Sequence, residues 1–187
     1  MPTAAGRLHR GTDEDVRQVL RTPFALTRAV RAPGVRRLRV SDATGPREWR
    51  FDLVTNVRWF ANGDSVADNY SAAVVELPVR FDGRVGFARR GFLRSPVKLD
   101  APPATAGSAK LHRRYDVRTT SPELATLILG GPLDEWLCSA RRSFHYELVH
   151  DRVLAYGWRR YIGGNAVLRA AEAFAARVVC SPTLDRR

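Results

Sequence analysis

His145 and Glu147 are the residues whose types and spacing best suit proton transfer. Residues two apart lie on one face of a β-strand, where an imidazole and a carboxylate can act as general acid and base. A pair of this kind is more often a surface hydrogen bond. The pair therefore supports one hypothesis among several, a hydrolase-type enzyme acting on a small acidic substrate.

Arginine dominates the ionisable residues. The chain has 31 Lys and Arg against 19 Asp and Glu, a net charge of +12, and its only lysines are Lys98 and Lys110. A GC-rich genome favours arginine, so one interpretation is a solvated basic surface. The other is an anion-binding face, because a positive field concentrates polyanions near the protein.

A hairpin in the second half leads to a specific anion site. Residues 143–149 and 153–158 are expected to pair around a three-residue loop, with six apolar or aromatic residues on one buried face. The facing pairs are Leu148 and Leu154, Tyr146 and Tyr156, and Phe144 and Trp158.

The same register places Arg142 opposite Arg160, with Arg141 and Arg159 beside them. Like charges directly opposite are destabilising. Either the strands splay and the guanidinium groups reach water or stack on Trp158, or the four groups bind a phosphate or carboxylate. We treat these five residues as the predicted anion site.

Motifs for other chemistry are missing from the sequence. It has no P-loop, no G-x-G-x-x-G after a strand, no G-x-S-x-G and no H-E-x-x-H. Cys138 and Cys180 form no C-x-x-C and have no histidine at ligand spacing, so we expect buried free thiols. Gly163-Gly164-Asn165 suits either a helix start or a phosphate-binding turn. The sequence predicts no metal, no cofactor and no catalytic residue.

Local patterns predict the elements that position these residues. Thr12 and the acidic residues after it predict a helix that ends before Pro23. Strands are predicted over 49–53 and 70–77, with a hairpin joining 78–81 to 84–87 at Asp82-Gly83. The later elements are a strand over 112–119, a helix from Pro122 to Gly130, a short helix from Pro132, the hairpin above and a final helix capped by Asn165.

These elements predict an α+β fold. An antiparallel sheet carries an N-terminal helix, two short mid-chain helices and a C-terminal helix packed on it. At 187 residues one domain is favoured over two. The expected boundaries are a flexible arm at 1–11, a single domain at 12–180 with a Pro- and Ala-rich loop at 95–109, and a tail at 181–187.

Several segments resemble a known family. They are Tyr115-Asp116-Val117-Arg118, Ser121-Pro122-Glu123-Leu124-Ala125, Glu135-Trp136-Leu137 and Phe144-His145-Tyr146-Glu147-Leu148. Their order is similar to that in a family of uncharacterised, largely actinobacterial proteins. The resemblance implies one compact α+β domain, tethered to a membrane in some relatives, and implies no reaction. This chain differs in its heavier arginine content and in lacking a hydrophobic tether.

The sequence thus predicts a bacterial, cytoplasmic binding or accessory module that is not an enzyme. Its basic face is expected to engage an acidic partner, because the net charge is +12. An acidic protein, nucleic acid and an anionic lipid surface stay open as partners, as does a homo-oligomer. No stretch approaches the roughly twenty apolar residues of a transmembrane segment. A nucleic-acid-binding protein and the hydrolase are the alternative functions.

Overall fold

The structure is a computed structural model that describes residues 8–28, 34–41, 47–59, 65–91, 99–140, 144–158 and 164–180. Its helices are α1 (Asp13–Arg21), α2 (Ala25–Arg28), α3 (Ala109–Arg114), α4 (Pro122–Leu129), α5 (Pro132–Ser139) and α6 (Gly164–Val179). Its strands are β1 (Leu8–Arg10), β2 (Gly34–Ser41), β3 (Glu48–Trp59), β4 (Ser65–Glu76), β5 (Arg84–Arg89), β6 (Tyr115–Thr119), β7 (His145–Val149) and β8 (Arg152–Trp158).

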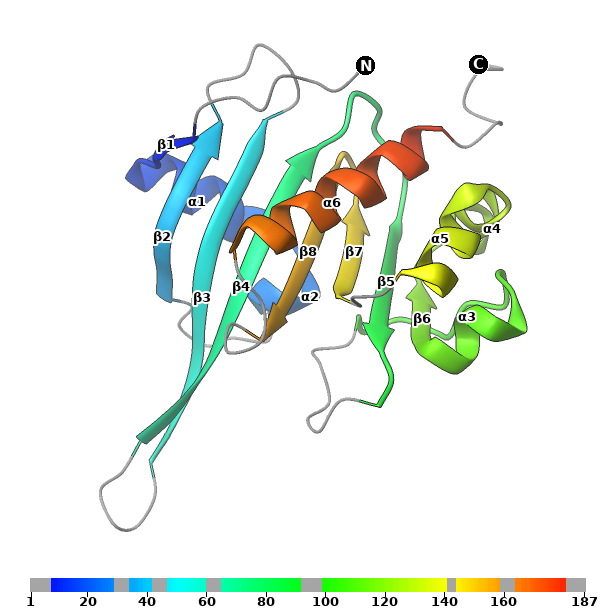
Figure 1. The fold of residues 1–187 in the computed structure, drawn as a ribbon, viewed down its shortest axis with the longest axis horizontal. Helices are drawn as coiled ribbons and strands as arrows, with labels where there is room; N and C mark the ends of the chain where they lie inside the picture. Colours follow the sequence, from blue (N-terminus) through cyan, green and yellow to red (C-terminus); the bar gives the residue numbers. More distant parts are fainter. Residues whose placement is uncertain are drawn as a thin grey trace.

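The eight strands of the described residues form one antiparallel sheet with the order β1-β2-β3-β4-β8-β7-β5-β6 (Figure 1). The first four follow one another across the sheet, and β8 then lies between β4 and β7. β4 pairs with β8 from Tyr70 opposite Trp158 to Glu76 opposite Arg152. This pairing joins the early and late strands in one sheet and confirms the predicted antiparallel α+β fold.

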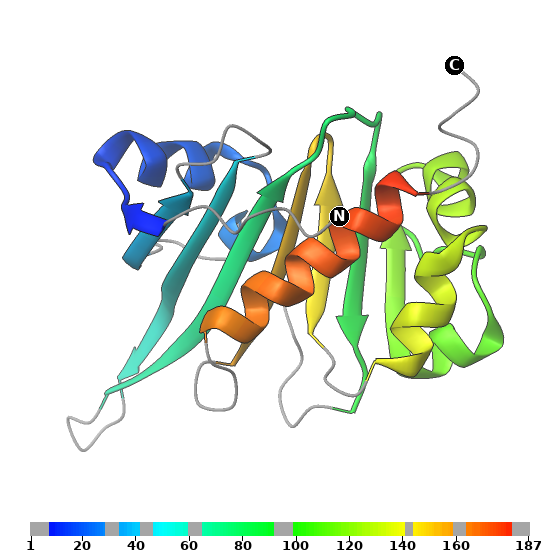
Figure 2. The ribbon, with the colours of Figure 1, turned by 45° about the horizontal axis from the view of Figure 1, so that its top comes forward.

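Helices pack on both faces of the sheet, and each face has its own apolar cluster (Figure 2). We call the face under α3 to α6 the α6 face, where Phe87 and Phe174 are buried. The opposite side is the α1 face, where Trp49 and Phe51 are buried beneath α1 and α2. α6 crosses the sheet over β4 and β8, so no described helix covers β1 and β2 on the α6 face (Figures 1 and 2).

Two helices begin, and a third packs, as their sequences predict. In α1, the Thr12 hydroxyl accepts a hydrogen bond from the Asp15 N–H at 3.3 Å, and the Asp15 carboxylate accepts one from the Thr12 N–H at 2.8 Å. Ser121 caps α4 by accepting from the Leu124 N–H at 3.2 Å. In α6, the residues predicted to share one face are all buried: Val167, Ala171, Phe174 and Val178.

The predicted register of β7 and β8 is wrong by one residue. Tyr146 lies opposite Ala155 instead of Tyr156. The turn contains two residues, His150 and Asp151, with a φ of 53° at His150, whereas the prediction assumed three. The α6 face therefore takes Tyr146 and Leu148, and the α1 face takes Leu154 and Tyr156.

The predicted hairpin joining 78–81 to 84–87 is also wrong. β5 pairs with β6 on one side and β7 on the other, so both of its edges are occupied. The segment before it bonds elsewhere, because the Phe81 N–H donates to the His150 carbonyl at 3.3 Å. Long-range pairing thus replaces the local hairpin.

Other local predictions need smaller corrections. Residues 112–114 belong to α3, so the strand expected over 112–119 begins only at Tyr115. Residues 8–10, predicted as part of the arm, form β1. Asn165 lies inside α6 and is not its cap. Cys138 is a buried free thiol as predicted, whereas Cys180 is exposed.

Among the described helices, none is both long enough and apolar enough to cross a bilayer.

Candidate functional site

His145 and Glu147 share the α1 face of β7, as predicted from their spacing, but both are buried. Their exposed fractions are 4% and 3%. All five residues of β7 are buried, because packed elements cover both faces of the sheet. The contacts of the two side chains therefore decide their role.

Glu147 holds the start of α2 against the sheet. Its Oε1 and Oε2 accept hydrogen bonds from the Ala25 N–H at 3.0 and 2.7 Å. Arg84 Nη2 donates to Oε1 at 2.8 Å, and the Arg84 side chain is itself only 15% exposed. These charge-assisted bonds compensate the desolvation of the carboxylate. Glu147 is thereby engaged as a structural ion pair.

His145 is neutral in the folded protein. Burial, together with the positive charge of Arg89, lowers the pKa of His145 to about 4. Its Nδ1 accepts a hydrogen bond from the Arg89 N–H at 3.1 Å, so the imidazole proton is on Nε2. The ring lies 4.9 Å from the Tyr156 ring. Burial, and then the charge of Glu147, raises the pKa of Tyr156 far above its usual value.

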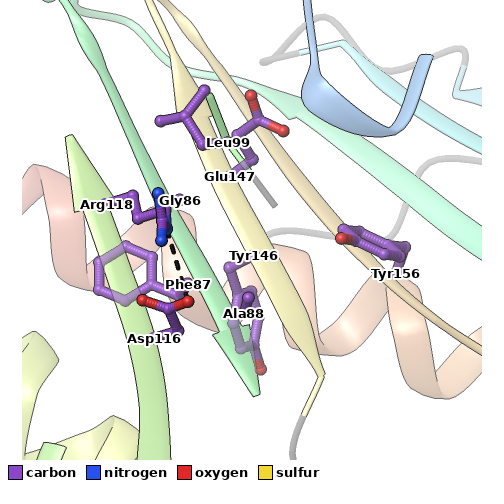
Figure 3. A pocket seen from close by; sticks show the side chains of 9 residues that line it. All are labelled: Gly86, Phe87, Ala88, Leu99, Asp116, Arg118, Tyr146, Glu147 and Tyr156. Atoms are coloured by element: carbon purple, nitrogen blue, oxygen red, sulfur yellow. Dashed lines mark hydrogen bonds and ion pairs between the residues drawn. The ribbon is translucent and has the colours of Figure 1, made fainter. Parts of the chain in front are cut away.

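The space beside these groups is a cavity of about 10 Å³ (Figure 3). Asp116 and Arg118 of β6 line it, and Arg118 Nε donates to Asp116 Oδ2 at 3.4 Å. Leu99 packs over Gly86, since a Cβ on Gly86 would lie 3.0 Å from Leu99 Cβ. The volume holds about one water, whereas ligand pockets measure several hundred Å³. This geometry favours a structural role over the hydrolase hypothesis.

The predicted anion site is largely outside the described residues, as Arg141, Arg142, Arg159 and Arg160 are. Trp158 is described and half-buried, and its ring lies 5.2 Å from that of Tyr70. The site stays a prediction, although the register from which it was derived is wrong.

A different set of arginines meets across β1, β2 and β3. Arg10 lies opposite Arg39, and Arg39 lies opposite Arg50. Trp49 and Phe51 are buried on the α1 face, so Arg50 between them points to the α6 face. Directly opposed Cα atoms are about 5 Å apart, so the three side chains begin within roughly 10 Å. We call Arg10, Arg39 and Arg50 the arginine row.

The arginine row has little compensating negative charge. Arg10 and Arg39 are exposed, and neither has an ion-pair partner among the residues that the structure describes. Arg50 is half-buried and donates to the side-chain oxygen of Asn165 in α6. Opposed like charges destabilise a sheet. The row thus lowers stability while presenting guanidinium groups that suit carboxylate or phosphate.

Two carboxylates of β3, Glu48 and Asp52, flank the row. The Ser71 hydroxyl donates to Asp52 Oδ1 at 3.1 Å, and Arg37 Nε lies 3.9 Å from Asp52 Oδ2. Burial, and then the negative charge of Glu172, raises the pKa of Glu48 above its usual value.

A groove of about 630 Å³ lies beside the arginine row at the edge of the sheet. Its lining residues are Arg10, Gly11, Asp13, Val16, Val35, Arg37, Leu38, Arg39 and Arg50. Basic and apolar side chains, together with the carboxylate of Asp13, therefore line one concavity. We call this concavity the edge groove.

Sequence reasoning missed the arginine row for two reasons. Arg39 and Arg50 each lie between two apolar residues, a pattern that predicts an outward direction for each. Their pairing could not be predicted, because a bulge between Arg36 and Arg39 shifts the register of β2 and β3. The contribution of Arg10 was also missed, since its strand was assigned to the arm.

Comparison with known proteins gives a structural neighbour. No protein-family model and no curated protein matches the sequence. Among solved structures, the crystal structure of the mycobacterial trehalose monomycolate transport factor A, TtfA, is similar, with a TM-score of 0.62. The alignment covers 94% of this chain and 87% of that chain at 9% sequence identity. The chain therefore has an α+β fold also found in a mycobacterial protein, consistent at the level of fold with the resemblance to actinobacterial proteins.

Proposed function

We propose that this protein is a non-catalytic binding protein whose arginine row engages an acidic partner. The observation that carries the proposal is the cross-strand register of Arg10, Arg39 and Arg50, of which Arg10 and Arg39 lie on strands whose α6 face no described helix covers. Each opposed pair costs stability that is comparable with the roughly 0.2 to 1 kcal/mol of a favourable cross-strand pair. A bound anion removes that repulsion.

Two further observations support a binding role. The groups best suited to acid–base chemistry, His145 and Glu147, are buried and engaged in structural contacts. The structural neighbour is named a transport factor, which agrees with an accessory role. The hydrolase alternative has no comparable support.

Retention on a heparin column tests the proposal. The double variant Arg10→Gln/Arg39→Gln should elute at lower salt than the wild type, because it loses the centre of the positive patch. The same variant should unfold at a higher temperature, since it removes opposed like charges. Weaker binding together with higher stability is the pattern of residues kept for function.

The matched control is Arg80→Gln/Arg113→Gln, which removes the same charge from exposed positions elsewhere. It should elute later than the arginine-row variant. Equal elution of the two double variants would reject the proposal. Tight binding of duplex DNA, with log affinity falling by about 0.9 per phosphate contacted for each log unit of salt, would favour the nucleic-acid alternative.

A further inference from the structure

The edge groove lies where the sheet has an unpaired strand edge. β1 pairs only with Arg39–Ser41 of β2, and the Gly11 N–H then donates to the Leu38 carbonyl at 3.0 Å. A Cβ on Gly11 would lie 2.6 Å from Leu38 Cγ, so glycine lets the chain leave β2 at this point. Residues 34–36 of β2 pair with β3 on one side and with no strand on the other, within the described residues.

The two walls of the edge groove have different chemistry. On the α1 face, Val16 and Val35 are half-buried and Leu38 is buried. On the α6 face lies the arginine row. Side chains of a strand alternate between the two faces of its sheet. A strand laid along this edge would therefore place one set of side chains on valine and leucine and the other on arginine.

The positive charges on the unpaired edge of β2 disfavour pairing of this edge with the same edge of a second copy of the chain. Arg36 and Arg37 are exposed on β2, and Arg37 has a φ of 55° in the bulge. Charged side chains of one sign prevent a strand edge from pairing with an identical edge. The same charges attract an acidic strand, which is how repulsive elements give specificity.

We infer that the partner presents an extended segment with alternating apolar and acidic residues, which adds as a strand to β2 beyond the end of β1. This inference rests on the proposed function and specifies its partner as a protein segment. Backbone hydrogen bonds supply affinity in such strand addition, and alternate side chains supply specificity. Acidic side chains contact the arginine row, and apolar ones cover Val16 and Val35.

Labelled short peptides test the inference by fluorescence anisotropy with the full-length protein. One peptide alternates valine and glutamate, and another has the same composition in two blocks. The alternating peptide should bind about tenfold more tightly, which corresponds to about 1.4 kcal/mol. Arg39→Gln should weaken its binding, whereas Arg113→Gln should not. Val35→Asn should weaken peptide binding and leave heparin retention unchanged.

Two methylated peptides test the backbone pairing directly. In a strand, the N–H groups of alternate residues point to opposite edges. Methylating every valine nitrogen blocks one edge, and methylating every glutamate nitrogen blocks the other. One of these peptides should lose binding, and the other should retain it.

The outcomes separate the two proposals. If all the peptides bind equally and Arg39→Gln weakens this binding, strand addition is overturned, whereas the proposal of an acidic partner still holds. Loss of binding with both methylated peptides, or with neither, would also overturn it. If no peptide binds and Arg10→Gln/Arg39→Gln leaves heparin retention unchanged, the proposed function fails as well.

Discussion

At the scale of single residues, the buried imidazole of His145 links stability to pH. The side chain accepts a backbone hydrogen bond and packs on Tyr156, and both contacts suit the neutral ring. A protonated ring would place a positive charge in a buried site near that of Arg89. The folded state therefore resists protonation that the unfolded chain accepts.

Stability should fall as the pH is lowered from 6.5 towards 4. The folded-state pKa of His145 is about 4, below the ordinary value of 6.5, so only the unfolded chain gains a proton in this interval. The loss should reach roughly 3 kcal/mol at 1.36 kcal/mol per pKa unit. Urea unfolding at several pH values measures it. His145→Gln should show a smaller pH dependence by this amount, whereas His9→Gln, at an exposed position, should match the wild type. Identical pH profiles for all three proteins would contradict the assignment.

The sequence indicated the shared face of His145 and Glu147 but not their burial. Alternation with Tyr146 and Leu148 is typical of a strand with one solvated face. The second face is covered by α2, and the contact joins residues far apart in the sequence, Ala25 and Glu147. No local pattern encodes that contact, so the two polar residues looked exposed.

At the scale of elements, α2 depends on one carboxylate from a distant strand. The helix has only four residues and starts on Glu147 of β7. Arg84 of β5 bonds to the same carboxylate, so Glu147 connects three elements. Figure 3 shows the Glu147 side chain among those that line the cavity.

Glu147→Ala should lower the free energy of unfolding by about 3 to 5 kcal/mol, because it leaves the charge of Arg84 buried without its partner. The double variant Arg84→Met/Glu147→Leu should lose less than the single variant, since no unpaired charge remains. Urea unfolding of the two variants measures both values. A single-variant cost within about 0.5 kcal/mol of zero, as for a surface substitution, would contradict this role.

Local sequence signals were enough to predict where helices begin, but they were not enough to predict which strands pair and in which register. Thr12, Ser121 and Pro122 act through their nearest backbone groups, so the starts of α1 and α4 were predicted correctly. The register of β7 and β8 depends on a two-residue turn. Because apolar residues occupy both faces of these strands, a shift of one residue still gave a plausible apolar face.

At the scale of the whole molecule, each apolar cluster contains residues from both halves of the chain. Leu154 and Tyr156 of β8 complete the cluster that contains Trp49, and Ala73 and Val75 of β4 complete the one on the α6 face. Neither half of the chain could bury its apolar side chains alone. A single domain over residues 12–180 stays a prediction, and its start needs correction because residues 8–10 form β1 of the same sheet.

The chain should unfold in one cooperative transition. Trp49 lies in the cluster of the α1 face, and Trp136 packs on that of the α6 face. Within each variant that retains only one of these tryptophans, the urea midpoint measured by fluorescence should coincide with the midpoint measured by circular dichroism. Separate midpoints for the two probes would indicate two domains.

The arginine row also belongs to this scale, because no single segment contains it. The row consists of side chains from three strands, Arg10, Arg39 and Arg50. Helix α6 lies over the central strands β4 and β8 beside the row. The net charge predicted a basic face and an acidic partner, but a net charge does not say where on the molecule the basic face lies. The location of the row required the topology.

The insertion of β8 between β4 and β7 has a consequence for synthesis on the ribosome. The chain emerges with β1 to β4 first, so these strands can pair in sequence while Ala72–Val75 at the outer edge of β4 await β8. An apolar, unpaired edge of this kind invites aggregation. We therefore expect the nascent chain to be prone to aggregation in the interval between the synthesis of β4 and that of β8.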